Sequence, residues 1–98
     1  MQIRYLQSGG FSGMRKTSVV DTLTLPAREA KKVEDLVESA GFFNLPEKFP
    51  KPKSGADYFT YSLTVEDGDR SHSVEVSEPS APASLRPLIR YLAALKKN

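Results

Sequence analysis

Residues 59–76 read FTYSLTVEDGDRSHSVEV, and this stretch decides the fold. Apolar and polar side chains alternate on both sides of Asp67-Gly68, a residue pair that favours a two-residue type I′ turn. A turn centred there places Val65 opposite Arg70, and the same register pairs Leu63 with His72, Tyr61 with Val74 and Phe59 with Val76. Both apolar sets then lie on one face, as a strand pair that covers a core requires. The stretch therefore predicts a β-hairpin.

A second hairpin is predicted at the start of the chain. Residues 1–7 place Ile3 and Tyr5 on one face of a strand, and residues 14–23 are rich in the β-branched side chains that strands favour. Between them, residues 8–13 read SGGFSG, and their glycines allow the backbone to adopt positive φ. We expect two strands joined by an oversized glycine-rich loop.

An amphipathic helix is predicted after each hairpin. Pro26 suits the first turn of a helix, and Gly41 suits the left-handed position that follows its last turn. Apolar residues recur between them at three- and four-residue steps: Ala30, Val33, Leu36, Val37 and Ala40. The second helix is predicted from about Ser84, with Pro87 in its first turn. Its apolar stripe consists of Leu85, Leu88, Ile89, Leu92 and Leu95.

This order of elements predicts one α+β domain over residues 1–98. Two β-hairpins would form an antiparallel four-stranded sheet, with two helices packed on one face in the chain order ββαββα. The order of the strands within the sheet does not follow from the sequence. Residues 44–56 contain Pro46, Pro50 and Pro52, so we expect a stiff, exposed loop there.

Composition narrows the class of protein. The 98 residues are 39% hydrophobic and 27% charged, which is enough apolar material for one folded core. Because the chain has no cysteine, it cannot form disulfides, thiolate metal sites or a cysteine nucleophile. We find no membrane-spanning run and no secretory signal, and expect a cytoplasmic protein. The net charge of +2 comes from interspersed signs and not from the basic stripe of a nucleic-acid-binding protein.

The chemistry-bearing residues do not assemble into an active site. His72 is the single histidine, and it lacks the nucleophile or the companion ligands that catalysis or zinc binding needs. Its place on the apolar face predicts a structural role at the edge of the core. Glu66, Asp67 and Asp69 share one turn but lack the spacing of a calcium loop. We therefore expect no enzyme activity, no metal site and no cofactor.

Two loops are candidates for contact with a partner. Phe11 stands at the apex of the glycine-rich loop without a core to enter, and exposed aromatic side chains mark contact sites. The alternative for this loop is a flexible hairpin tip. The proline–lysine segment could touch an acidic surface, and its alternative is a solvated linker. The predicted partner-binding residues are Ser8, Gly9, Gly10, Phe11, Ser12, Gly13, Lys48, Phe49 and Lys51.

Several stretches together resemble a known family. They are Ser8-Gly9-Gly10-Phe11 with Gly13 and Arg15, Glu29-Ala30, Leu36-Val37, Phe42-Phe43, Leu45-Pro46, Leu63-Thr64-Val65-Glu66-Asp67-Gly68, His72, Val74 and Leu85-Arg86-Pro87-Leu88. Over nearly the whole chain they resemble the emfourin-like proteins, bacterial inhibitors of protealysin and related thermolysin-like zinc metallopeptidases. The resemblance implies a competitive protein inhibitor that plugs the peptidase cleft. We expect it to act as a monomer.

The resemblance does not supply a contact map, so the contact site is our own hypothesis. Thermolysin-like enzymes favour cleavage on the amino side of bulky apolar residues, and Phe11 would enter their primary pocket while the flanking glycines let the backbone approach. The proline–lysine segment would brace this contact. One alternative is an interaction domain of the same fold with a non-peptidase target. Another is a small nucleic-acid-binding module that uses Lys48, Lys51, Lys53, Lys96 and Lys97.

Overall fold

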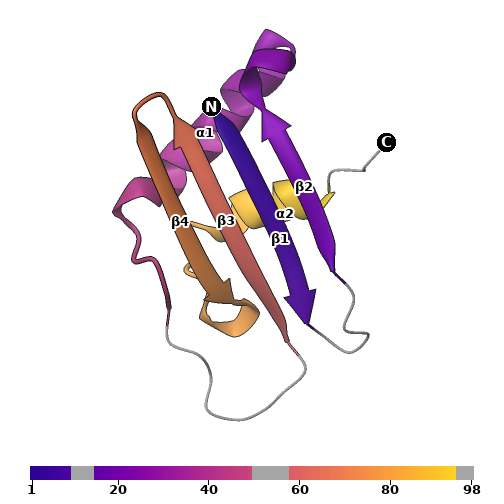
Figure 1. Cartoon of the computed structure of the whole chain (residues 1–98), viewed down its shortest axis with the longest axis vertical. Helices are drawn as coiled ribbons and strands as arrows, with labels where there is room; N and C mark the ends of the chain where they lie inside the picture. The colour runs from indigo at the N-terminus through magenta and orange to yellow at the C-terminus, as the bar shows by residue number, and fades with distance from the viewer. Residues whose placement is uncertain (10–14, 50–57, 95–98) are drawn as a thin grey trace.

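The computed structural model describes residues 1–9, 15–49 and 58–94. Four antiparallel strands form one sheet in the order β2-β1-β3-β4, and two helices lie against one of its faces (Figure 1). The strands are β1 (Gln2–Gly9), β2 (Lys16–Asp21), β3 (Phe59–Asp67) and β4 (Arg70–Ser77). The helices are α1 (Ala27–Ala40) and α2 (Arg86–Ala94). The predicted α+β fold with two hairpins and two helices is confirmed.

The N-terminal strand β1 lies in the interior of the sheet, between β2 and β3. Ile3 faces Val20 on one side and Val65 on the other, and Tyr5 faces Ser18 and Leu63 in the same way. These apolar side chains point towards the helices and are buried. The opposite face of the sheet remains uncovered by any described element, and it carries alternate residues such as Arg4 and Leu6.

The register predicted for the second hairpin is wrong by two residues. Val65 faces His72, Leu63 faces Val74 and Tyr61 faces Val76, because the turn is centred on Gly68-Asp69 and not on Asp67-Gly68. Gly68 has a φ of 62° while Asp69 does not have a positive φ, the pattern of a type II′ turn with glycine first. This turn places Asp67 opposite Arg70, and their side chains form an ion pair of 3.0 Å. Since the shift is even, the apolar residues keep the predicted face.

The end of α1 is as the sequence predicts, while α2 begins at Arg86, two residues later than predicted, and the predicted stripe residue Leu95 lies outside the described residues. Gly41 ends α1 in the left-handed conformation with a φ of 61°, and its N–H donates to the carbonyl groups of Val37 and Glu38. Pro87 is the second residue of α2, where its missing N–H breaks no helical hydrogen bond. The buried faces of the helices join the inner face of the sheet in one core cluster, which includes Val33, Val37, Ala40, Leu88, Ile89 and Leu92. Within the described residues, neither helix has the length and apolarity needed to cross a membrane.

Short elements differ from the sequence expectation at both edges of the sheet. β2 ends at Asp21, whose side chain accepts a hydrogen bond from the N–H of Leu23 and starts a 3-10 turn, η1 (Thr22–Thr24). After a second turn, η2 (Phe42–Asn44), the chain does not remain a free loop. Residues 47–49 run parallel to β4: the Glu75 N–H donates to the Glu47 carbonyl, and the Phe49 N–H donates to the Glu75 carbonyl. Part of the predicted exposed loop therefore extends the sheet.

Candidate binding site at the loop end of the sheet

The predicted binding residues that the structure describes lie in two places. Ser8 and Gly9 end β1, while Lys48 and Phe49 lie beyond β4, so that β3 and β4 separate them from β1. Gly10, Phe11, Ser12, Gly13 and Lys51 fall outside the described residues. The structure therefore does not bring the two predicted loops together through Lys48. We define the loop end as the end of the sheet formed by Ser8, Gly9, Tyr58 and Phe59.

At the loop end, the backbones of β1 and β3 approach closely. Gly9 faces Phe59 in the ladder and has a φ of 85°, a backbone angle that residues other than glycine rarely adopt. A Cβ added to Gly9 would lie 3.1 Å from the carbonyl oxygen of Tyr58. Gly9 leads into residues 10–14 and Tyr58 follows residues 50–57. The two predicted binding segments consequently leave the sheet from neighbouring main-chain positions.

A row of aromatic side chains supports the loop end from the helix side. The Tyr5 and Tyr61 rings stack with centroids 6.1 Å apart, and Phe59 follows Tyr61 at 6.5 Å. The Tyr5 hydroxyl donates a hydrogen bond of 2.7 Å to the side-chain oxygen of Gln7. Burial, and then the neighbouring Tyr61, raises the pKa of Tyr5 to about 12. These contacts give the loop end a rigid, packed base.

A small cavity of about 210 Å³ lies between α2 and the turn η3 (Glu78–Ser80) that follows β4. Arg86 anchors this turn, because its guanidinium donates to the Ala81 carbonyl at 3.1 Å and to the Glu78 carbonyl at 3.5 Å. Tyr61 also lines the cavity, and burial and then Glu78 raise its pKa, against a smaller opposing effect of Arg86. The turn is thereby fixed next to the aromatic row.

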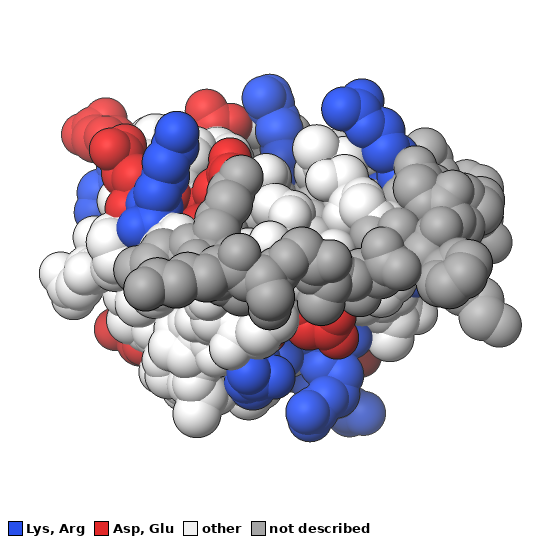
Figure 2. All heavy atoms as spheres, turned by 90° about the horizontal axis from the view of Figure 1, so that it is seen from below, with Lys and Arg blue, Asp and Glu red and all other residues white. Residues whose placement is uncertain are grey.

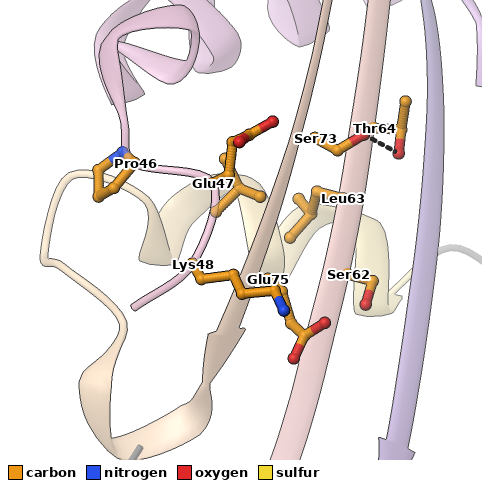
Figure 3. Close-up of a pocket in the computed structure, with 9 residues that line it drawn as sticks. Pro46, Glu47, Lys48, Ser62, Leu63, Thr64, Ser73 and Glu75 are labelled. Atoms are coloured by element: carbon orange, nitrogen blue, oxygen red, sulfur yellow. Dashed lines mark hydrogen bonds between the residues drawn. The ribbon is translucent and has the colours of Figure 1, made fainter. Parts of the chain in front are cut away.

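Lys48 and Phe49 face opposite sides of the sheet. Lys48 lines a groove of about 580 Å³ on the open face, where its side chain extends towards Glu75 (Figure 3). Hydroxyl groups form much of the groove floor, and Thr64 and Ser73 share a hydrogen bond of 2.9 Å. Phe49 is partly buried and packs against the core. Its packing gives Phe49 a structural role independent of any partner.

Charges of both signs surround the loop end. Figure 2 shows this end of the molecule, and in its described part both basic and acidic side chains stand around the margin. Among the described residues, this mixture of signs differs from the uniformly basic surface that attracts a nucleic-acid backbone. Across the described ranges, no three histidine, cysteine or acidic side chains come close enough together to hold a metal ion.

The position of His72 confirms its predicted structural role. Its Nε2 atom lies 2.6 Å from the carbonyl oxygen of Leu45, and because a carbonyl only accepts, the ring donates this hydrogen bond. The ring also makes an edge-to-face contact with Phe42, with centroids 5.7 Å apart, and a tilted contact with Phe43 at 6.4 Å. The histidine thus ties β4 to the segment after α1.

Sequence reasoning missed three features of this region. The approach of Gly9 to Tyr58 depends on β1 pairing with β3, and no local pattern carries that information. The anchoring of η3 by Arg86 is a local contact, over five and eight residues, but it uses backbone carbonyl groups that no side-chain pattern marks. The aromatic row does have a signal, since Tyr5, Phe59 and Tyr61 all occupy inward-facing positions of their strands.

The fold and the loop end define a small α+β domain whose rigid sheet supports two neighbouring segments at one end. The chain matches the Emfourin family over residues 6–93 and belongs to that family. Comparisons with curated proteins and with solved structures gave no match.

Proposed function

We propose that this protein inhibits a thermolysin-like zinc metallopeptidase by occupying the active-site cleft with the loop end of its sheet. Membership of the Emfourin family carries the proposal. The resemblance described above implies that emfourin-like proteins inhibit protealysin-like enzymes. The protein is not proposed to perform catalysis. Its role is to hold a surface that fits the cleft of another protein.

The glycine-rich segment is the proposed contact. Phe11 supplies the bulky apolar side chain that a thermolysin-like pocket accepts, and its glycine neighbours Gly9, Gly10 and Gly13 leave the main chain free of side chains that would clash with the cleft. A buried aromatic anchor of this kind commonly contributes ~2 kcal/mol or more to binding. Ser8 and Gly9, which end β1, would set the direction in which the segment leaves the sheet.

The scaffold behind the contact supports the proposal. β1 is paired along its length with both β2 and β3, so the strand that leads into the glycine-rich segment is held on two sides. The aromatic row of Tyr5, Phe59 and Tyr61 packs beneath the same end. A scaffold that is already ordered reduces the entropy lost on binding, which favours tight inhibition.

A titration of a purified thermolysin-like peptidase with this protein tests the proposal. We expect the rate of substrate cleavage to fall as inhibitor is added, with an apparent Michaelis constant that rises while the maximal rate is unchanged. A serine peptidase assayed in parallel provides the control and should keep its activity. If a panel of thermolysin-like enzymes retains full activity at a large excess of this protein, the proposed function is wrong.

A further inference from the structure

The two edge strands of the sheet, β2 and β4, differ in what lies beside them. At the β4 edge, residues 47–49 add a short parallel segment that hydrogen-bonds with Glu75. At the β2 edge, the described part of the chain contains no strand beyond β2. β2 also has no proline, glycine or bulge, which are the usual features that prevent an edge from pairing with another strand. Within the described ranges, the β2 edge is therefore open to pairing with a further strand.

The direction of the main-chain groups along β2 follows from one hydrogen bond. The Thr22 N–H donates to the Met1 carbonyl at 2.9 Å, so this facing pair is a hydrogen-bonded one. Such pairs alternate with non-bonded pairs along an antiparallel ladder. Val20 and Ser18 therefore point their main-chain groups towards β1, while the odd-numbered residues point theirs outwards: Thr17, Val19 and Asp21.

The same odd-numbered residues place their side chains on the open face of the sheet. Val19 is 64% exposed, and Leu23 just beyond the strand is 87% exposed. They are the large hydrophobic residues that stand out to solvent in the described ranges. Lys16 is the charged residue that begins β2. Its side chain does not project from the edge where it would hinder strand pairing, because its Nζ atom donates to the Ala93 carbonyl on α2, 2.6 Å away.

We propose that two copies of this chain pair through β2, antiparallel about a two-fold axis at Val19. In this register Val19 faces Val19 of the second copy, and Thr17 faces Asp21. In this register the main-chain N–H and C=O groups that point outwards from one β2 strand face those of the other strand and can form hydrogen bonds. The side chains on the open face of one copy also lie next to those on the open face of the other. Arg15 lies diagonally across from Asp21, which adds opposite charges at both ends of the ladder.

The pairing goes beyond the proposed function and does not compete with it. The loop end lies at the Lys16 end of β2, so antiparallel copies direct their loop ends away from each other. A single strand pair buries less area than the ~1,200 Å² of a small stable complex, so we expect a weak dimer that dissociates on dilution. The sequence led us to expect a monomer, and the sedimentation experiment below distinguishes that state from the proposed dimer.

Complementary charges at one position test the pairing. Val19→Glu and Val19→Lys each place two like charges on the two-fold axis and should abolish the dimer in sedimentation velocity experiments at high protein concentration. An equimolar mixture of the two variants should recover it, because Glu then faces Lys. Circular dichroism shows whether each variant is folded. Recovery in the mixture supports the register, and a mixture that stays monomeric while the wild type dimerises overturns it.

A cross-link provides the second measurement. The chain contains no cysteine, so Val19→Cys introduces a single thiol. Facing Cα atoms of a hydrogen-bonded pair lie ~5.5 Å apart, within the range that a disulfide spans. Under mild oxidation we expect Val19→Cys to form a covalent dimer faster than Ser71→Cys, a control on the exposed surface of β4. Equal rates, together with a wild type that sediments as a monomer at every concentration, would refute the proposal.

Discussion

The Nε2 atom of His72 donates a hydrogen bond to the Leu45 carbonyl across 2.6 Å and thereby joins β4 to the segment that follows α1. Replacing this residue in His72→Ala would leave the carbonyl without its partner and remove the ring packed against Phe42. We expect the free energy of unfolding to fall by about 1–3 kcal/mol. Urea denaturation followed by circular dichroism measures it.

The matched control for His72 is its neighbour on the same strand. Ser71 is exposed, and Ser71→Ala should change the unfolding free energy by less than about 0.5 kcal/mol. Inhibition of a peptidase should survive both changes after correction for the folded fraction, because neither residue lies at the loop end. A specific loss of inhibition in folded His72→Ala would give this histidine a functional role.

Phe11→Ala tests the proposed anchor directly. If Phe11 enters the primary pocket of the peptidase, its truncation should raise the inhibition constant at least ~10-fold, the equivalent of 1.4 kcal/mol or more. Phe11→Leu retains a bulky apolar group, so its inhibition constant should rise less than that of Phe11→Ala. An inhibition constant that does not change in Phe11→Ala would remove this residue from the contact site.

Gly9→Ala tests the close approach at the loop end. The added methyl group would meet the Tyr58 carbonyl at 3.1 Å, and alanine would also be strained at a φ of 85°. We expect a loss of about 1–3 kcal/mol of stability together with weaker inhibition. Inhibition is measured at a temperature where the variant remains folded.

Gly68→Ala is the control for this glycine. Gly68 also has a positive φ, of 62°, but a Cβ there meets nothing within 4 Å, and the turn lies at the other end of the sheet. Alanine at Gly68 should destabilise the fold by a similar strain while folded molecules inhibit as the wild type does. Equal effects of the two substitutions on inhibition would show that Gly9 does not position the contact.

The stability of the protein should fall at alkaline pH in a way that depends on Tyr5. Its pKa is about 12 when folded and near 10 when unfolded, so the unfolded state binds fewer protons between these values. The stabilisation is complete below pH ~10 and is lost as the pH rises towards ~12, by on the order of 2 kcal/mol. Urea denaturation as a function of pH should show a shallower decline in Tyr5→Phe. Parallel declines in both proteins would assign the effect to other groups.

Phe49→Ala separates packing from binding in the segment beyond β4. Because Phe49 is partly buried against the core, we expect a loss of about 1–3 kcal/mol of unfolding free energy. Lys48→Ala, one residue away on the open face, should leave stability within about 0.5 kcal/mol of the wild type. The comparison requires thermal or urea denaturation of both variants. Equal stabilities would mean that Phe49 contributes little to the core.

Local patterns in the sequence predict most of the elements. The alternation around residues 59–76 specifies which side chains of β3 and β4 are buried, and Gly41 marks the end of α1. The turn between β3 and β4 was misplaced because Asp67-Gly68 and Gly68-Asp69 both allow a two-residue turn with the same buried face. The ion pair between Asp67 and Arg70 favours the second arrangement.

Features that depend on contacts distant in the sequence did not follow from it. The order β2-β1-β3-β4 brings the first strand against the third, and this pairing alone places Gly9 beside Tyr58. Proline density predicted a stiff, exposed loop for residues 44–56, yet the main-chain groups of Glu47 and Phe49 bond with Glu75. Of the predicted contact residues that the structure describes, Ser8 and Gly9 end the interior strand β1, whereas Lys48 and Phe49 lie beside the edge strand β4.

The short parallel segment at residues 47–49 has a consequence for aggregation. A sheet with two open edges can add copies at both sides and grow into a fibre, whereas a sheet with one closed edge stops after a single addition. This segment covers β4 at Glu75 and so opposes the addition of another strand there. Loss of the segment would leave the main chain of Glu75 open to a further strand and so favour aggregation through this edge.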